Sequence, residues 1–295
     1  MKNLFICCMA VILAVNVSYG VSCFWNNGDS ANNYWVNPGN WDNLPTSVDG
    51  AYFNSLMPGD ALIKDGDSAV AQNVYISHNR HYSDGSPLVL RQTGGSLSIG
   101  GQLLLGVADA NAYGKLIMEG GEINVGVAGG LSVFVGKTGR GIIEMSGGTI
   151  NTVSNFDVGG AYSGSDGVFN MTGGVLNVGG ALKAGRVAGA KGRIYISGGT
   201  VNATHLYHDY GWLPEGDGLV DVSGTGEIIL VGQDKTKLEN YIANGYLTAN
   251  GNNNDAVIVE YQEGGEWYTS MTAVPEPATM LLLGLGGIVL GRKRS

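Results

Sequence analysis

The chain has 295 residues, 50 of them glycine, and carries 16 Lys and Arg against 25 Asp and Glu, a formal net charge of −9 at pH 7. This acidic balance excludes the basic surface that nucleic acids and anionic membranes require. Three cysteines are too few for a disulfide-stapled fold or a cysteine-based zinc site, and we expect neither a metal nor any other cofactor.

The first 20 residues have the parts of a secretory signal peptide. Lys2 precedes an apolar stretch over residues 4–15, and Ser18 and Gly20 place small residues before a cleavage point after residue 20. This arrangement predicts export and removal of residues 1–20 by signal peptidase. A buried first helix is the less favoured alternative, because the stretch has the flanks of a signal.

Residues 21–59 predict a cap over one end of a repetitive domain. The segment is rich in Trp and Asn, and residues 34–41 with the Pro and Asp that follow resemble the opening of many bacterial surface β-helix proteins. Trp35 and Trp41 are candidates for stacking on a sugar ring. The alternative, which we favour, is that they plug the end of a solenoid. Acylation of Cys23, which follows a faint lipoprotein-like box, is a minor interpretation.

Residues 60–235 contain a glycine-rich repeat. Glycine pairs recur every 25 to 27 residues, at Gly94-Gly95, Gly120-Gly121, Gly147-Gly148, Gly173-Gly174 and Gly198-Gly199. A fixed period in this range is typical of a solenoid, in which each repeat buries its apolar face by stacking on the next. Glycine suits the corners because it adopts a positive φ at little cost.

Three short alternating segments lie within each repeat, for example residues 122–125, 133–136 and 142–145. Alternation with period two, bounded by glycine, predicts strands rather than helices. We therefore predict an all-β fold, a right-handed parallel β-helix with about seven turns of about 26 residues and three strands per turn. Asparagines that share one register predict a hydrogen-bonded ladder along the axis: Asn124, Asn151, Asn177 and Asn202.

Residues 236–273 predict a cap over the other end. The sequence from Thr236 to Glu239 has the pattern of a capping box, which predicts a short helix up to Asn244 that Gly245 ends. Two alternating segments on either side of residues 262–266 predict a hairpin.

Residues 274–295 form a signal in three parts. An apolar run covers residues 278–290 and, at about 1.5 Å per residue, reaches about 20 Å, short of the roughly 30 Å hydrocarbon core of a bilayer. The run therefore predicts a short transmembrane segment that anchors the chain transiently in the inner membrane, with its positive end in the cytoplasm. A Pro-Glu-Pro box precedes the run and a basic cluster follows it: Pro275, Glu276, Pro277, Arg292, Lys293 and Arg294.

The order of these parts resembles the PEP-CTERM sorting signal of exopolysaccharide-producing Gram-negative bacteria. The resemblance covers only the tail. It implies processing by the membrane protease exosortase near the Pro-Glu-Pro box, and a destination in the cell envelope or extracellular matrix with polysaccharide as a neighbour.

One outward row of the predicted solenoid collects groups that are able to transfer protons. Asp157, Lys183 and His208 fall in this row on successive turns, with Arg186 close by. Neighbours one strand spacing apart are close enough for proton transfer, and polysaccharide lyases on β-helix scaffolds place such groups on one face. An ordinary cross-strand charge pair is the alternative that we favour, so no residue is assigned as catalytic.

The loop after this row is aromatic, and its Tyr210 and Trp212 are further candidates for glycan contact. Together these features predict an exported structural or adhesive protein associated with exopolysaccharide. A polysaccharide-binding module, or a polysaccharide lyase or glycoside hydrolase on the outer face of the β-helix, stays open as the alternative.

Overall fold

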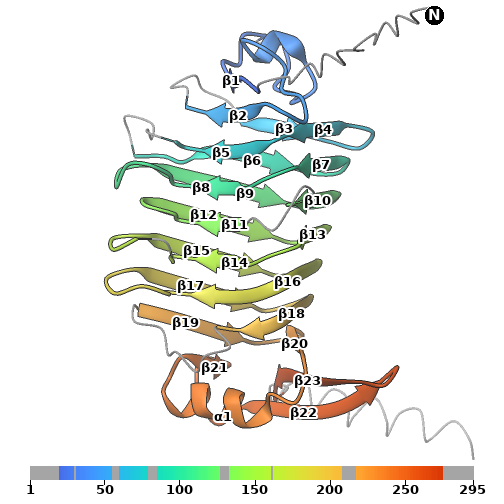
Figure 1. Ribbon diagram of the computed structural model, residues 1–295, viewed down its shortest axis with the longest axis vertical. Helices are drawn as coiled ribbons and strands as arrows, with labels where there is room; N and C mark the ends of the chain where they lie inside the picture. The colour runs from blue at the N-terminus through green and yellow to red at the C-terminus, as the bar shows by residue number, and fades with distance from the viewer. Residues whose placement is uncertain are drawn as a thin grey trace, which may run out of the picture.

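The protein is a parallel β-solenoid of about 8 turns, with about 26 residues in each turn. The computed structural model describes residues 20–29, 31–54, 60–78, 85–126, 133–160, 162–207 and 217–274. Its turns stack along the long axis from the N-terminal to the C-terminal end (Figure 1). The all-β class and the period are as predicted. The solenoid is longer than the predicted seven turns, because β1 (Ser22–Phe24) already pairs in parallel with β2 (Gly50–Phe53), and β2 pairs in parallel with β5 (Asn73–Ile76).

Three columns of strands make up the walls of the solenoid, one strand of each column per turn. The first column contains β4 (Ser68–Ala71), β7 (Ser96–Ile99), β10 (Glu122–Val125), β13 (Thr149–Thr152), β16 (Val175–Ala184), β18 (Thr200–Leu206) and β20 (Glu227–Val231). The second contains β1 (Ser22–Phe24), β2 (Gly50–Phe53), β5 (Asn73–Ile76), β8 (Leu103–Leu105), β11 (Val133–Val135), β14 (Phe156–Val158) and the C-terminal parts of β16 and β18. The third contains β3 (Ala61–Ile63), β6 (Leu88–Gln92), β9 (Tyr113–Met118), β12 (Arg140–Met145), β15 (Asp166–Met171), β17 (Lys191–Ile196), β19 (Asp217–Val222) and β21 (Leu247–Ala249).

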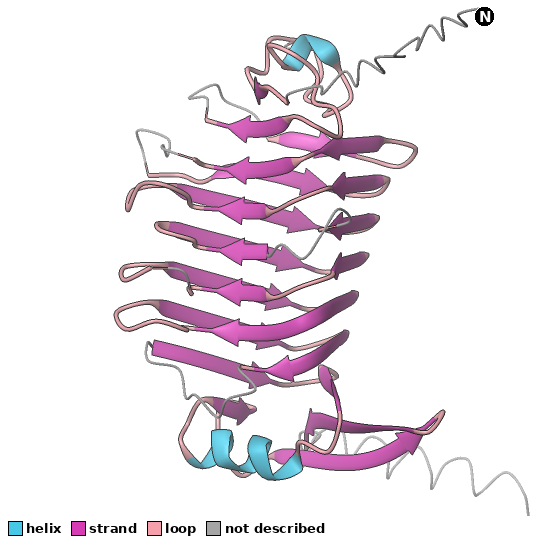
Figure 2. Cartoon of the chain, in the orientation of Figure 1, coloured by secondary structure: helices cyan, strands magenta, loops and turns pink. Residues whose placement is uncertain are grey.

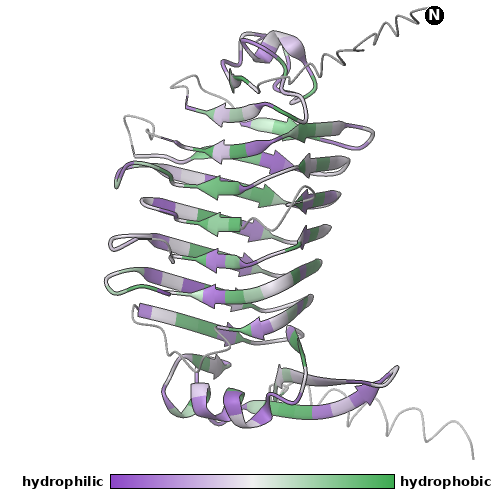
Figure 3. Ribbon diagram, viewed as in Figure 1, coloured by the Kyte–Doolittle hydropathy of each residue, from purple (hydrophilic) through white to green (hydrophobic). Residues whose placement is uncertain are grey.

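The core is a set of apolar stacks that run parallel to the axis. Polar and apolar residues alternate along the strands, as Figure 3 shows. In the first column, for example, Leu97, Ile123 and Ile150 lie in register on successive turns and are fully buried. Each buried aliphatic side chain contributes roughly 1.5–3 kcal/mol relative to exposure. The one-to-one register therefore follows from the sequence pattern, because a slip by one residue would expose every inward side chain.

The glycine pairs form one corner of the solenoid, as predicted. The second glycine of a pair has left-handed backbone geometry, for instance Gly148 with φ of 76°. A Cβ on Gly148 would also lie only 2.6 Å from the carbonyl oxygen of Gly121 on the preceding turn. Both the dihedral angle and the close approach of the backbones require glycine here.

A second set of glycines, which we call the glycine seam, has no counterpart in the sequence-based predictions. Its members are buried, lie in register near the start of the third-column strands and face the turn that ends the second-column strand: Gly114, Gly141, Gly167, Gly192 and Gly218. A Cβ on Gly167 would lie 2.2 Å from the carbonyl oxygen of Val135 and 2.3 Å from the amide nitrogen of Gly159. Along the seam, backbone therefore packs directly on backbone.

Replacing one seam glycine should destabilise the fold strongly. In Gly167→Ala the methyl group meets two rigid backbone atoms, and we expect a loss of about 3 kcal/mol or more in the free energy of unfolding. Urea unfolding of the secreted protein measures this loss in the free energy of unfolding. Gly164→Ala is the matched control, because Gly164 has a φ of 87° but no atom within 4 Å of an added Cβ, so it should lose only about 1 kcal/mol. Equal losses in the two variants would contradict close packing at the seam.

The predicted asparagine ladder is present on the outer face of the first column. Each side-chain nitrogen donates to the amide oxygen one turn earlier, from Asn151 to Asn124 at 2.8 Å, from Asn177 to Asn151 at 2.7 Å and from Asn202 to Asn177 at 2.9 Å. All three bonds point the same way along the axis. The ladder ends where Ile229 takes the place of asparagine on the following turn.

An aromatic plug closes the N-terminal end. The rings of Trp25, Trp35, Trp41 and Phe53 pack with centroids 4.9 to 5.8 Å apart, and the indole nitrogen of Trp41 donates to the carbonyl of Trp35 at 2.8 Å. A short 3-10 helix, η1 (Pro38–Asn40), lies just before Trp41. The plug covers apolar side chains that would otherwise face water at the first turn.

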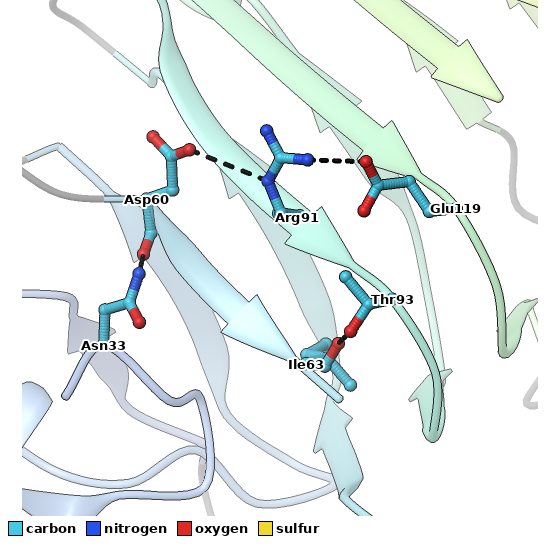
Figure 4. A network of polar contacts seen from close by, with 6 residues as sticks. All are labelled: Asn33, Asp60, Ile63, Arg91, Thr93 and Glu119. Carbon is cyan, nitrogen blue, oxygen red and sulfur yellow. Dashed lines mark hydrogen bonds and ion pairs between the residues drawn. The ribbon is translucent and has the colours of Figure 1, made fainter. Parts of the chain in front are cut away.

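Polar contacts attach this end to the third column (Figure 4). The side chain of Asn33 donates to the carbonyl of Asp60. Arg91 in β6 bridges neighbouring levels, with its Nη1 2.7 Å from Glu119 Oε1 and its Nε 4.0 Å from Asp60 Oδ2. Thr93 adds a longer bond to the carbonyl of Ile63, at 3.5 Å.

Helix α1 (Lys235–Ala243) covers the C-terminal end (Figure 2). Its inner face buries Leu238 and Tyr241, and the Tyr241 hydroxyl donates to the carbonyl of Leu206 at 3.3 Å. The predicted capping box is wrong, because the N-cap is Asp234, two residues before Thr236. The helix ends before Gly245, as predicted, and Gly245 has a φ of 75°.

The predicted hairpin follows, with β22 (Ala256–Glu263) and β23 (Glu266–Ala273) joined by two glycines of positive φ. This two-residue turn matches the twist of antiparallel strands. β23 pairs antiparallel with β20 and so ends the parallel ladder of the first column.

Candidate functional site

The outward row of the second column is continuous over seven levels. In register it reads Phe24, Tyr52, Tyr75, Leu104, Phe134, Asp157 and Lys183. The rings of Tyr52 and Tyr75 stack at 4.3 Å, and burial beside Tyr52 raises the pKa of the Tyr75 hydroxyl to about 12. The row is therefore aromatic at its N-terminal end and charged at its C-terminal end.

The structure brings three of the four predicted chemical groups together. Asp157 and Lys183 lie directly opposite each other on adjacent turns, and Arg186 Nε lies 3.5 Å from Asp157 Oδ1. Asp157 is 2% exposed and Lys183 is 4% exposed, although both occupy outward positions. The turn at Gly160 and the Arg186 side chain lie against Asp157, since a Cβ on Gly160 would lie 3.4 Å from Arg186 Cβ and 3.5 Å from Asp157 Cβ.

This covered cluster has the electrostatics of an internal charge pair. Burial lowers the pKa of the Lys183 ammonium below its ordinary value of 10.5, Asp157 opposes this shift and Arg186 adds to it. An amine with a lowered pKa is chemically suited to accept a proton. In the arrangement seen here, however, a polymer outside the solenoid reaches only Arg186, because the other two side chains are covered.

The fourth group, His208, lies outside the described residues, as do Tyr210 and Trp212. In β18, Leu206 pairs with Leu182, the residue before Lys183. Tyr207, which follows Leu206, has a φ of 57° and a ring that is buried against Tyr241. The predicted vertical alignment of Lys183 with His208 stays a prediction, because the register of β18 ends at Leu206.

Two other predicted sites turn out to be buried. Trp35 is 1% exposed and Trp41 is 4% exposed, so neither offers a ring face to a sugar, and both belong to the plug. The Cys23 thiol is fully buried in β1, and burial, with smaller effects from Asp49 and Asp42, raises its pKa to about 11. A lipid on Cys23 is incompatible with this packing, which corrects the minor interpretation.

A shallow groove of about 480 Å³ lies on the outer face of the first column and was not foreseen from the sequence. One side is the asparagine ladder. The other side consists of the outward residues two positions further along the strands, and of Tyr268 on β23, which pairs with Val231. These residues are Val153, Gly179, Thr204, Val231 and Tyr268. The hollow exists because Gly179 has no side chain between its longer neighbours. The signal in the sequence was the absence of charge at these outward positions.

Within the described parts of the chain, no group of three His, Cys, Asp or Glu residues is placed to hold a metal ion. Nor does any described helix have the length and apolar character needed to cross a membrane. The predicted membrane segment at 278–290, the Pro-Glu-Pro box and the basic cluster all lie outside the described residues, as does Ser18.

Comparison with known proteins identifies a motif at the C-terminal end of the chain. Residues 273–295 match the family model of the PEP-CTERM protein-sorting motif. Searches of curated proteins and of solved structures gave no match. Fold and motif together define an exported all-β protein with a C-terminal sorting motif. The chain carries a PEP-CTERM sorting motif behind a β-helix region, and the motif indicates sorting by exosortase.

The covered charge pair predicts unequal effects on stability. Asp157→Asn leaves Lys183 and Arg186 close together without their counter-ion, and we expect a loss of about 3 kcal/mol in urea unfolding at pH 7. Lys183→Met, the matched control, removes the poorly solvated amine and should lose less than about 1 kcal/mol.

The pH dependence gives a second measure of the same pair. Because the Lys183 pKa is lower in the folded chain, the unfolded chain binds more protons there, and stability rises with pH toward 10.5. In Asp157→Asn this rise should begin at lower pH, since Asp157 opposes the lowering, and in Lys183→Met it should vanish. Identical pH profiles in the three proteins would refute the buried-pair description.

Proposed function

We propose that the solenoid is a structural or adhesive component of an extracellular polysaccharide matrix in a Gram-negative bacterium. On this proposal, signal peptidase cleaves after Gly20, the C-terminal segment anchors the chain briefly in the inner membrane, and exosortase cuts near residues 275–277. The chain then divides into an N-terminal cap over 21–59, repeats over 60–235 and a C-terminal cap over 236–273.

The observation that carries the proposal is that, among the described residues, the cluster with suitable chemistry is buried. Asp157 and Lys183 are almost inaccessible, and only Arg186 is substantially exposed. A rigid, capped solenoid with an acidic composition suits a scaffold that stays soluble among hydrated polymers.

A polysaccharide lyase is the second candidate, and the lowered pKa of Lys183 beside Arg186 favours it. A lyase needs a base that removes the proton next to a uronic acid carboxylate and a cation that stabilises the resulting charge. Lys183 and Arg186 have the chemistry for these two roles. The enzyme would require a movement that uncovers Lys183.

Incubation with plain and acidic polysaccharides separates the two candidates. For the scaffold, the secreted protein should be retained on immobilised polysaccharide without producing the ultraviolet absorbance of unsaturated uronides or new reducing ends. Such absorbance, lost in Lys183→Ala but kept in Lys191→Ala on the third column, would instead establish the lyase. Concentration-dependent filaments with no retention would contradict association with polysaccharide.

The sorting step has its own test. With Pro275→Ala and Pro277→Ala the recognition box is gone, so the hydrophobic tail should stay attached and the precursor should collect in the membrane fraction at its unprocessed mass. Thr279→Ala, within the tail but outside the box, is the matched control. Release of the double variant at the wild-type mass would contradict the role of the box.

A further inference from the structure

We infer that the groove on the first column is a binding site for one strand of a neutral polysaccharide, lying parallel to the solenoid axis. The inference rests on the proposed association with polysaccharide and names the place and the chemical class of the glycan. The groove crosses β13, β16, β18, β20 and β23, which gives it a length of about 19 Å at about 4.8 Å per strand. A length several times that of one sugar ring suits a polymer rather than a single sugar.

The ladder side of the groove offers paired donors and acceptors at a regular spacing. Asn151, Asn177 and Asn202 are half-buried, and each amide donates one hydrogen along the ladder and keeps an oxygen lone pair. Asn177 and Asn202 also keep a second hydrogen, whereas Asn151 donates its second hydrogen to Glu122. At the end of the ladder, the amide oxygen of Asn202 accepts no ladder bond from the next turn within the described residues, because Ile229 takes the place of asparagine there. Sugar hydroxyls both donate and accept, so they complement such a row.

The opposite side is apolar and aromatic. Val153 is 55% exposed and Val231 is 44% exposed, and they flank the hollow at Gly179. Tyr268 lies level with Val231 and stacks on Tyr261 with centroids 5.6 Å apart, which fixes its ring. Apolar C–H faces of a sugar pack on such surfaces, and a fixed ring loses little entropy on binding.

The charge distribution selects a neutral glycan over an acidic one. None of the residues that line the groove is charged. Acidic residues lie beside the groove: Glu122 on β10, which accepts from Asn151 at 2.9 Å, Glu227 on β20 and Glu266 on β23. A polyuronate would meet these carboxylates on a protein that is acidic overall and would find no cation in the groove.

Affinity electrophoresis of the secreted protein tests the site, with hydroxyethylcellulose as the neutral probe and alginate as the acidic one. Val153→Arg with Val231→Arg fills the groove with long side chains at exposed positions. Val70→Arg is the matched control, because Val70 is 37% exposed on β4 of the same column, away from the groove. Circular dichroism and thermal unfolding should show that all three proteins are folded alike.

We expect hydroxyethylcellulose to slow the wild type and Val70→Arg, alginate to slow neither, and the double variant to bind about tenfold more weakly. Unchanged binding by the double variant, or equal binding of alginate, would overturn the groove assignment while leaving association with polysaccharide intact. Retention of no protein by either probe would overturn both. Self-association of the wild type that the double variant loses, measured by sedimentation, would show that a second copy occupies the groove.

Discussion

The packing of backbone on backbone along the glycine seam is the constraint on which the other features depend. At Gly167 the main chain of one turn approaches the corner of the second column so closely that even a methyl group would overlap it. This contact fixes the distance between the second and third columns. With that distance fixed, the inward side chains of all three columns can fill a narrow core at uniform register.

The uniform register of the turns also determines which outward side chains contact each other. Because each residue lies over its counterpart one strand spacing away, identical side chains pair directly, as the asparagines do, and opposite charges pair likewise. Asp157 and Lys183 are such a pair, both are buried, and the turn at Gly160 lies against Asp157. Their burial turns a surface charge pair into part of the structure, which is why they are less available for chemistry than their outward positions imply.

The features that could be predicted from the sequence are those determined by residues close together in the chain. The strands and the asparagine ladder follow from alternation and period, and both were predicted. The seam repeats with the same period, as a single glycine at the second residue of β9, β12, β15, β17 and β19, so its signal was present in the sequence but was not distinguished from the many other glycines. The covering of Asp157 depends on the path of the turn at Gly160, and the groove depends on Gly179 lying between side chains of neighbouring turns. Neither arrangement is local in sequence, so neither could be read from it.

The one-to-one register has a consequence for the length of the molecule. From β7 to β18, a first-column strand begins at an equivalent position on every turn, as Thr149 and Val175 do, so each turn presents the next with nearly the same surface. Nothing in the stack itself specifies how many turns there are. The aromatic plug and helix α1 do, because each replaces a turn with a surface on which no further turn can pair. A family of such proteins can therefore change its reach by gaining or losing whole turns between two unchanged ends.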